Sequence, residues 1–225
     1  IYYAASTYKN GYEIRYITKD GKETAALKRE SSAPYPFIIG FEDGRIYYSD
    51  DTKRFYYADL DLKNETYLFK SNYYDSGFVC EGKIYFFDSY ETKNVDGEQV
   101  YTTIISAYDI ESGEKTKIKD NVCIHGGVPM VFRSGTRLYY GDSNPKKMGT
   151  SVYRKYTGEL GEHVVYDYGS KKIYYYDMVT GENGVYIEDL GANMGQIYYA
   201  DENVAVLYNF YYDYDFNDPD ANTDD

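Results

Sequence analysis

The stretch that decides the fold is Ile46-Tyr47-Tyr48-Ser49-Asp50, a five-residue aromatic motif that recurs along the chain. Six copies of this motif occur, and five of them end in Asp. The copies begin at Ile1, Ile46, Ile84, Leu138, Ile173 and Ile197. Their starts are 45, 38, 54, 35 and 24 residues apart. Since a fixed period of this kind marks repeat architectures, the sequence predicts a chain built from similar structural units.

The interval that follows the second motif predicts four short strands. They cover Arg45–Ser49, Phe55–Leu60, Thr66–Lys70 and Gly77–Cys80, and polar turns separate them. Neighbouring intervals carry Gly turns of the kind that hairpins need, such as Ser112-Gly113-Glu114. We therefore expect each interval to fold as one four-stranded antiparallel sheet, which is the unit of a β-propeller blade.

The motif places apolar side chains on both faces of its strand. Because successive side chains of a strand alternate, Ile46 and Tyr48 lie on one face and Tyr47 on the other. A blade between two neighbouring blades is buried in this way, whereas a two-sheet sandwich leaves one face wet. No window sustains the apolar spacing of a helix. The predicted fold class is all-β, with a sandwich as the second choice.

Counting strands by interval predicts a propeller of about five blades. Residues 128–168 supply one set of four strands and residues 172–211 supply the last set. We expect the strand Ala205–Tyr211 to complete the N-terminal sheet and close the ring. The alternative is an open fragment of a six- or seven-bladed propeller. Residues 1–212 are assigned to this domain and residues 213–225 to an acidic flexible tail or linker.

Composition excludes several classes of protein. The 225 residues include 33 Tyr and no Trp, and 43% are hydrophobic, which is enough apolar surface to exclude disorder of the whole chain. The net charge of -13 argues against nucleic acid and anionic lipid as partners. No apolar run is long enough for direct membrane insertion. The chain begins at Ile1 without an initiator Met, so we expect it to be a piece of a longer protein.

The Ile-Tyr-Tyr-x-Asp motif, followed by a strand such as Arg15-Tyr16-Ile17-Thr18 and a Gly turn, resembles the YWTD propellers of the lipoprotein-receptor family. It is similar above all to their Tyr-rich bacterial relatives, the propeller domains of unknown function on secreted or surface proteins of Gram-positive bacteria. The resemblance covers about residues 1–201. It implies that the motif's Asp is structural and fixes one blade against the next through backbone contacts. These residues are Asp50, Asp88, Asp142, Asp177 and Asp201.

A second resemblance is carried by the segments Lys83–Asp88 and Lys172–Asp177. They look like the aromatic hairpins of choline-binding-type cell-wall repeats and of clostridial toxin repeats. Those repeats stack Trp and Tyr around the ligand at about half the period seen here, and this chain has no Trp. A cell-wall-binding aromatic repeat domain is therefore an alternative.

The sequence offers little for catalysis, and we expect no enzyme activity. Only two histidines occur, His125 and His163, and neither lies in a recognisable catalytic motif. Cys123 and His125 share a strand face, but a buried thiol beside a loop histidine is the favoured interpretation. We expect Cys80 and Cys123 to be independent thiols, although their pairing stays open. The alternative activity is that of a propeller glycosidase with two or three channel carboxylates.

The acidic tail carries the one candidate metal site. Asp213, Asp215 and Asn217 match the first ligand positions of a calcium loop, and Asp224 falls at the twelfth. Asp218 occupies the position where such a loop needs Gly, so a flexible tail is favoured over a Ca²⁺ site. No other cofactor is expected.

Tyrosines in consecutive pairs are candidates for stacking on a ligand, because an aromatic face with a hydroxyl suits binding surfaces. The candidates are Tyr56, Tyr57, Tyr73, Tyr74, Tyr211 and Tyr212. Together with the resemblance, they predict a non-catalytic extracellular binding or scaffold module. Its expected partner is a protein or a glycan, and we expect a monomer that is secreted or displayed at the cell surface.

Overall fold

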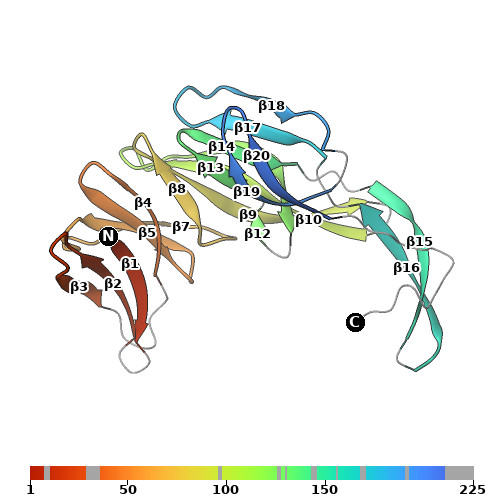
Figure 1. The fold of residues 1–225 in the computed structure, drawn as a ribbon, viewed down its shortest axis with the longest axis horizontal. Helices are drawn as coiled ribbons and strands as arrows, with labels where there is room; N and C mark the ends of the chain where they lie inside the picture. The colour runs from red at the N-terminus through yellow and green to blue at the C-terminus, as the bar shows by residue number, and fades with distance from the viewer. Residues whose placement is uncertain are drawn as a thin grey trace. The chain divides into compact units, whose positions relative to one another are not determined.

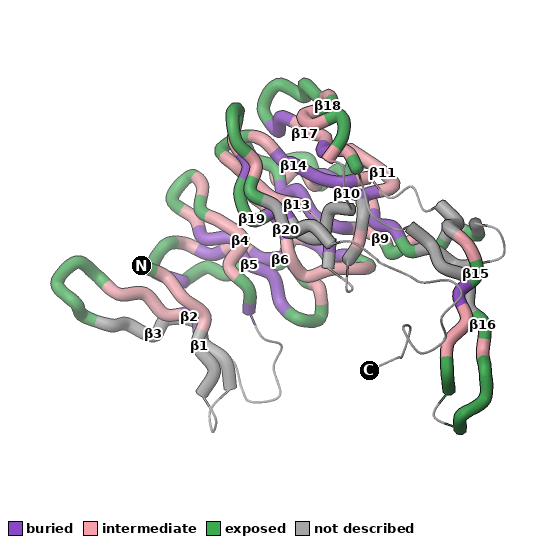
Figure 2. The backbone as a smooth tube through the Cα atoms, turned by 45° about the vertical axis from the view of Figure 1, so that its right-hand side comes forward, coloured by how far each residue is buried: buried purple, intermediate pink, exposed green. Residues whose placement is uncertain are grey.

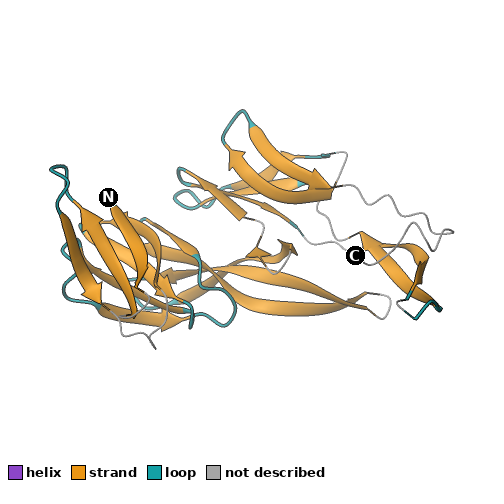
Figure 3. Ribbon diagram, turned by 60° about the horizontal axis from the view of Figure 1, so that its bottom comes forward, coloured by secondary structure: helices purple, strands orange, loops and turns teal. Residues whose placement is uncertain are grey.

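The computed structural model describes residues 1–7, 11–28, 36–95, 98–125, 128–129, 131–142, 146–155, 157–167, 171–190 and 193–210. These residues form strands, turns and loops, with no helix among them (Figures 1 and 3). Within the same ranges, no helix has the length and apolar character needed to cross a membrane. The chain divides into two compact units, one of residues 1–90 with 103–120 and one of residues 91–102 with 121–225.

The first unit begins with two antiparallel sheets. The first contains three strands in sequence order: β1 (Tyr2–Thr7), β2 (Gly11–Ile17) and β3 (Glu23–Lys28). The second contains four strands in sequence order: β4 (Pro36–Glu42), β5 (Arg45–Asp50), β6 (Arg54–Asp59) and β7 (Thr66–Lys70). The second motif is therefore the second strand of its sheet, β5. The preceding strand β4 belongs to the same sheet.

The third sheet shows that the predicted grouping of strands is displaced by one. Its strands follow in the order β8 (Gly77–Cys80), β9 (Lys83–Val95), β10 (Glu98–Asp109), β11 (Lys115–His125) and β12 (Val128–Pro129). Gly77–Cys80 was expected to be the fourth strand of the second sheet, and that expectation is wrong. The Glu81-Gly82 turn joins β8 directly to β9, and both residues have positive φ, as a tight two-residue hairpin requires.

The second unit corrects the expected division of residues 128–211 into two sets of four strands. One sheet has the order β13 (Val131–Ser134), β14 (Arg137–Gly141), β17 (Ile173–Asp177) and β18 (Asn183–Ile187). The fourth and fifth motifs are thus neighbours in one sheet, with Tyr139 opposite Tyr175. The intervening strands β15 (Lys146–Arg154) and β16 (Leu160–Asp167) pair only with each other among the described strands.

The last two strands, β19 (Asn193–Ala200) and β20 (Ala205–Phe210), form a two-stranded sheet. Val206 of β20 pairs with Tyr199 of β19. The described residues of β20 therefore pair inside the second unit. Completion of the N-terminal sheet by this strand, and with it ring closure and the number of blades, stays a prediction.

The second sheet is buried on both faces, as the alternation within its motif predicts. Four consecutive residues of β5, Ile46, Tyr47, Tyr48 and Ser49, are each at most 2% exposed. Figure 2 shows this buried stretch along β5. An exposed face would have required every second residue to be open to solvent. The fold class predicted from the sequence, all-β with four-stranded antiparallel sheets of the propeller type, is confirmed.

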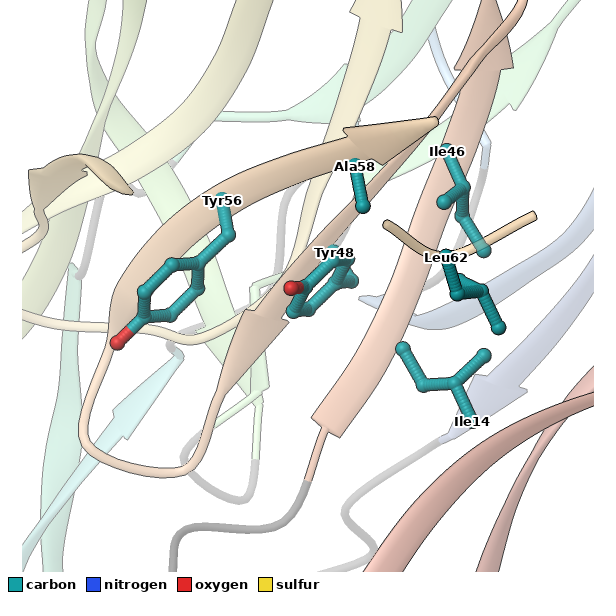
Figure 4. Packing of buried hydrophobic residues seen from close by; sticks show 6 residues of the cluster. All are labelled: Ile14, Ile46, Tyr48, Tyr56, Ala58 and Leu62. Atoms are coloured by element: carbon teal, nitrogen blue, oxygen red, sulfur yellow. The ribbon is translucent and has the colours of Figure 1, made fainter. Parts of the chain in front are cut away.

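Residues from neighbouring segments cover each face of this sheet. On one face, Tyr48 and Ile46 pack with Ile14 of the first sheet and with Leu62 (Figure 4). On the other face a separate cluster joins the second and third sheets; its buried members are Tyr47, Phe55, Phe69, Val79, Ile84 and Phe86. The first three sheets therefore share two apolar layers inside the first unit. In the second unit, a smaller core joins Tyr139 and Ile173 to Ile197 and Ala200.

Candidate binding pocket

A row of side chains lies on one face of the second sheet, at the end where a turn joins β4 to β5. Arg45 and Tyr47 are two residues apart on β5 and share this face. Tyr57 of β6 is paired with Tyr47, and Thr66 of β7 is paired with Tyr57, so the row crosses three strands. Leu68 extends the row along β7. Because side chains alternate along β5, Tyr47 of the second motif lies on this face, at the bottom of a polar and aromatic surface.

Three turns surround the row. The first is Asp43-Gly44, between β4 and β5, where both residues have positive φ. The second is the Glu81-Gly82 turn between β8 and β9. The third lies between β10 and β11 and is closed by Asp109, whose carboxylate accepts hydrogen bonds from the amides of Glu111 and Ser112 at 3.1 and 2.9 Å. Each turn is short, and the third is closed by its own hydrogen bonds.

Hydrogen bonds tie these turns to one another. The two carboxylate oxygens of Glu42 accept from the amides of Glu81 and Gly82 at 2.6 and 2.8 Å. The carbonyl of Gly82 in turn accepts from the amide of Ile110 at 3.0 Å. Since hydrogen bonds to a charged carboxylate are among the stronger ones in proteins, Glu42 fixes the second sheet against the turn of the third.

A cavity of about 520 Å³ lies between the row and the turns. Arg45, Tyr47, Tyr57, Thr66 and Leu68 form its walls, and all of them belong to the second sheet. Gly82 and Ile110 lie opposite them, and the remaining lining residues are the four acids Asp43, Glu81, Asp109 and Glu111. Pockets that hold small ligands or single anchoring side chains typically measure about 300 to 1,000 Å³. The cavity lies entirely inside the first unit.

The cavity's electrostatics are set by one cation and four carboxylates. The guanidinium carbon of Arg45 lies 4.4 Å from the centre of the Tyr57 ring, which is a cation–π contact. Burial raises the pKa of Tyr47, while its hydrogen bond with Arg45 opposes that rise. The amide and hydroxyl of Ser112 hold the pKa of Asp109 below its ordinary value. Asp109 is therefore an anion at neutral pH.

The predicted stacking tyrosines fall into four groups. Tyr57 lines the cavity. Tyr56 does not face a ligand: it is 9% exposed, stacks on Tyr48 at 5.5 Å and donates a hydrogen bond to Asp50 at 3.2 Å, so this prediction is wrong. The alternation of side chains along β6 separates the two neighbours, since it sends Tyr56 into the opposite core. Tyr211 and Tyr212 lie outside the described residues.

Tyr73 and Tyr74 form a second aromatic group with Tyr90. The ring centre of Tyr73 lies 4.9 Å from that of Tyr90 and 5.8 Å from that of Tyr74. Burial raises the pKa of Tyr73 to about 12, with the neighbouring phenols adding to the rise. Tyr90 is 45% exposed, so the group reaches the surface. It is separate from the cavity, which none of the three rings lines.

Three of the five repeated aspartates accept hydrogen bonds from backbone amides of the turn that follows them. Asp50 accepts from the amides of Thr52 and Arg54 at 2.9 and 3.1 Å. Asp177 accepts from the amides that follow it at positions 179 and 180, both at 3.0 Å. Asp201 does the same at positions 203 and 204, at 2.7 and 2.9 Å. These bonds lie within one hairpin, whereas the resemblance implied contacts between blades.

The other two repeated aspartates make different contacts. The carboxylate of Asp88 lies 4.0 Å from the Lys115 ammonium and accepts from the Asn72 side chain at 3.4 Å. The carboxylate of Asp142 accepts from the Tyr174 hydroxyl at 3.4 Å. A structural role for all five aspartates stays a prediction.

Several predicted features fall beyond what the structure describes. The acidic tail, with Asp213, Asp215, Asn217 and Asp224, lies outside the described residues, as do the side chains of Cys123, His125 and His163. Cys80 is buried at the end of β8. Among the described residues, no group of three or more His, Cys, Asp or Glu side chains is arranged to hold a metal ion.

No family model and no curated protein matches this chain. Among solved structures, the chain is similar to one from a nidogen/laminin complex, at 16% identity over 80% of this chain and 68% of that one, with a TM-score of 0.43. It is similar to a puromycin hydrolase at 17% identity, over 79% and 24% of the two chains, with a TM-score of 0.44. An oligogalacturonate lyase solved with manganese matches at 14% identity, over 77% and 41%, with a TM-score of 0.39.

This chain therefore spans less than half the length of the hydrolase and of the lyase. The fold class follows from the strand pairing and from the burial of both sheet faces.

The sequence did not predict the cavity, although Tyr57, one of the candidate stacking residues, lines it. The lining residues come from four separate stretches of chain, within 43–47, 57–68, 81–82 and 109–111. No motif or spacing links these stretches. The available signal was a Gly preceded by an acid just before the second and third motifs, at Asp43-Gly44 and Glu81-Gly82. Such pairs are typical of tight hairpins, and two neighbouring hairpins of this kind form the acidic rim.

Proposed function

We propose that this chain is a non-catalytic binding module that recognises a protein partner through the cavity of its first unit. The observation that carries the proposal is the cavity itself, which is lined by aromatic side chains, a guanidinium and four carboxylates. Tyr and Arg are the residues that most often dominate the binding energy of protein interfaces. The cavity is held by tight turns and by the Glu42 hydrogen bonds, so little ordering entropy is lost when a partner binds.

The chemistry of the rim favours binding over hydrolysis. A glycosidase needs one carboxyl with a raised pKa to act as a general acid. Asp109, the least exposed of the four acids, has a lowered pKa because Ser112 donates hydrogen bonds to its carboxylate. The extracellular location and the monomeric state belong to the same proposal and are supported by the resemblance of the aromatic motif to surface propeller domains.

The proposal is tested by blocking the cavity. Thr66 lines it from β7, and Thr66→Trp would fill it with an indole. Thr150→Trp on β15 is the matched control, because Thr150 is exposed and lies in the other unit. The wild type and both variants would be applied to arrays of synthetic peptides and glycans, with melting curves to confirm that each is folded.

We expect the wild type and Thr150→Trp to bind the same peptides, and Thr66→Trp to lose them. Peptide binding that survives in a folded Thr66→Trp variant would overturn the proposal. Binding of glycans alone, lost in Thr66→Trp, would keep the cavity as the site and replace the protein partner with a carbohydrate.

Glycoside hydrolysis is the second candidate function, and one observation favours it. Asp75 is the one described carboxyl with a raised pKa; burial is the main cause, and the charges of Asp51 and Asp50 add to it. A carboxyl of this kind beside other acids is a candidate general acid. The test is hydrolysis of a panel of aryl glycosides by the wild type and by Asp75→Asn. Activity that disappears in Asp75→Asn would establish this function, and equal inactivity of both proteins would remove it.

A further inference from the structure

The lining of the cavity is strongly asymmetric in charge. Asp43, Glu81, Asp109 and Glu111 contribute four negative charges, and Arg45 contributes one positive charge. The whole chain has the same sign, with a net charge of -13. A ligand that enters this cavity therefore meets a negative potential, which attracts cationic groups and repels anionic ones.

The rim acids have no basic partner within the part of the chain that the structure describes. No Lys or Arg nitrogen there lies within 4.0 Å of the carboxylates of Asp43, Glu81 or Glu111. Lys83 is close enough to Asp109 to contribute to its lowered pKa, but it is the weakest of the causes. The cation that would neutralise the rim is thus not supplied by the described residues.

The interior of the cavity suits an alkyl chain. Leu68 and Ile110 line it and belong to the partly buried margin of the apolar cluster beneath, in which Tyr47 is 2% exposed. Lys and Arg side chains bury their methylene stems along apolar surface while the charged head stays at a polar rim. A cavity with an apolar floor and carboxylates around its mouth fits both parts of such a side chain.

Arg45 has a different role from the acids. Its guanidinium is stacked on Tyr57, and among the described residues no carboxylate lies within 4.0 Å of it. It can therefore donate to a neutral or anionic acceptor, and the backbone carbonyls of a peptide are acceptors of this kind. A site with an arginine beside four acids favours a peptide over a simple cation, because a peptide has both cationic side chains and carbonyls.

From these features we infer that the cavity takes a Lys or Arg side chain of a basic peptide segment, with backbone carbonyls of that segment on Arg45. The inference rests on the proposed function and names the chemistry of the partner. Complementary charge also speeds association, because long-range attraction steers a basic segment toward the rim.

The test uses a fluorescently labelled peptide of alternating Lys and Gly, and a second peptide with Gln in place of Lys. Binding to the whole chain is measured by fluorescence anisotropy at about 0.15 M salt, where charges beyond about 8 Å are largely screened. The test variant is Glu81→Gln with Glu111→Gln, which neutralises two rim acids and leaves Asp109 to close its turn. The control is Glu159→Gln with Glu162→Gln, which removes the same charge from exposed residues of the second unit.

We expect the Lys peptide to bind and the Gln peptide to bind weakly or not at all. The rim variant should bind the Lys peptide with roughly tenfold lower affinity, because each exposed ion pair contributes up to about 1 kcal/mol. The control variant should change its affinity less than about twofold, since its charges lie outside the cavity. Arg45→Gln should also weaken binding of the Lys peptide. If long-range attraction alone decided the affinity, removing this positive charge would instead strengthen binding.

Three results would overturn the inference. If the rim and control variants lost equal affinity for the Lys peptide, the effect would come from net charge and not from the cavity. Tighter binding of the Lys peptide to Arg45→Gln would assign Arg45 a purely repulsive role. Neutral peptides that bind the wild type, bind the rim variant equally well and no longer bind Thr66→Trp would refute a basic ligand while leaving the proposed function in place. Failure of Thr66→Trp to affect any ligand would instead refute the proposed function.

Discussion

Gly40 of β4 lies directly against Val79 of β8, where the second sheet meets the third. A Cβ on residue 40 would lie 2.4 Å from Cγ1 of Val79, a separation that no relaxed contact allows. Val79 is 2% exposed, and its branched side chain has little rotamer freedom. We predict that Gly40→Ala lowers the free energy of unfolding by about 1 to 3 kcal/mol, as overpacking of a core does. Urea denaturation measures the loss.

Val79→Ala provides the control for this contact. Alone it should be destabilising, because it removes buried methyl groups. In the double variant the new Cβ would occupy part of the vacated space, so the double variant should lose less stability than the two single variants combined. Strict additivity would show that the two sheets do not meet at this point.

Glu42 is predicted to stabilise the turn that borders the cavity. Replacing it with Ala removes the acceptor for the amides of Glu81 and Gly82. Because hydrogen bonds to a charged group contribute about 1.5 to 3 kcal/mol when shielded and less near solvent, we expect a loss of about 1 to 2 kcal/mol in thermal unfolding. Glu42→Gln keeps one acceptor oxygen and should lose less. Equal stability of Glu42→Ala and the wild type would contradict the assigned contact.

Asp177 gives the fold a pH dependence whose sign follows from its contacts. The amide of Thr180 is the main cause of its lowered pKa, so the folded protein favours the charged carboxylate. The contribution is therefore present above the ordinary pKa of 3.8 and is lost as the pH falls through the lower pKa of the folded state. The stability difference between wild type and Asp177→Asn should be constant near neutral pH and shrink in acid. A difference that grows in acid would refute this assignment.

Asp75 is predicted to act in the opposite direction. Its pKa is raised by burial and by the charges of Asp51 and Asp50, so the folded state disfavours its charged form. The carboxylate should destabilise the protein above its ordinary pKa of 3.8, and the penalty should vanish below it. We expect Asp75→Asn to raise the free energy of unfolding at neutral pH by roughly 0.5 kcal/mol or less, given the partial exposure. Destabilisation by Asp75→Asn at neutral pH would contradict this sign.

The sequence was sufficient to predict the strands but not how they group into sheets. Alternation in the aromatic motif predicted that β5 is buried on both faces, because it places Ile46 and Tyr48 on one face and Tyr47 on the other. The Glu81-Gly82 hairpin decides that β8 pairs with β9, and this local signal outweighs the interval between motifs. The pairing of β14 with β17 is nonlocal, because the β15–β16 hairpin lies between them in the chain. No residue pattern in β14 or β17 predicts this inserted hairpin.

The candidate site was predictable only in part for a related reason. Tyr57 was a candidate because it belongs to a pair of consecutive tyrosines, but Arg45, Glu81 and Ile110 have no chemical signature of their own. They meet because Glu42 binds the amides of one turn and Gly82 binds the amide of another. Contacts between turns far apart in the chain depend on how the sheets pack, and a sequence pattern does not predict that packing.

The second, third and fourth copies of the aromatic motif form strands buried on both faces, and oxidative footprinting of their tyrosines tests this burial. Tyr47, Tyr48, Tyr85 and Tyr139 are at most 2% exposed, whereas Tyr67 and Tyr198 are 55% and 57% exposed. We predict that hydroxyl-radical labelling with mass spectrometry modifies Tyr67, and Tyr198 of the sixth copy, at least tenfold faster than these four buried tyrosines of the second, third and fourth copies. Labelling that alternates along one motif, with Tyr47 modified and Tyr48 protected, would instead indicate a sheet with one face exposed to solvent.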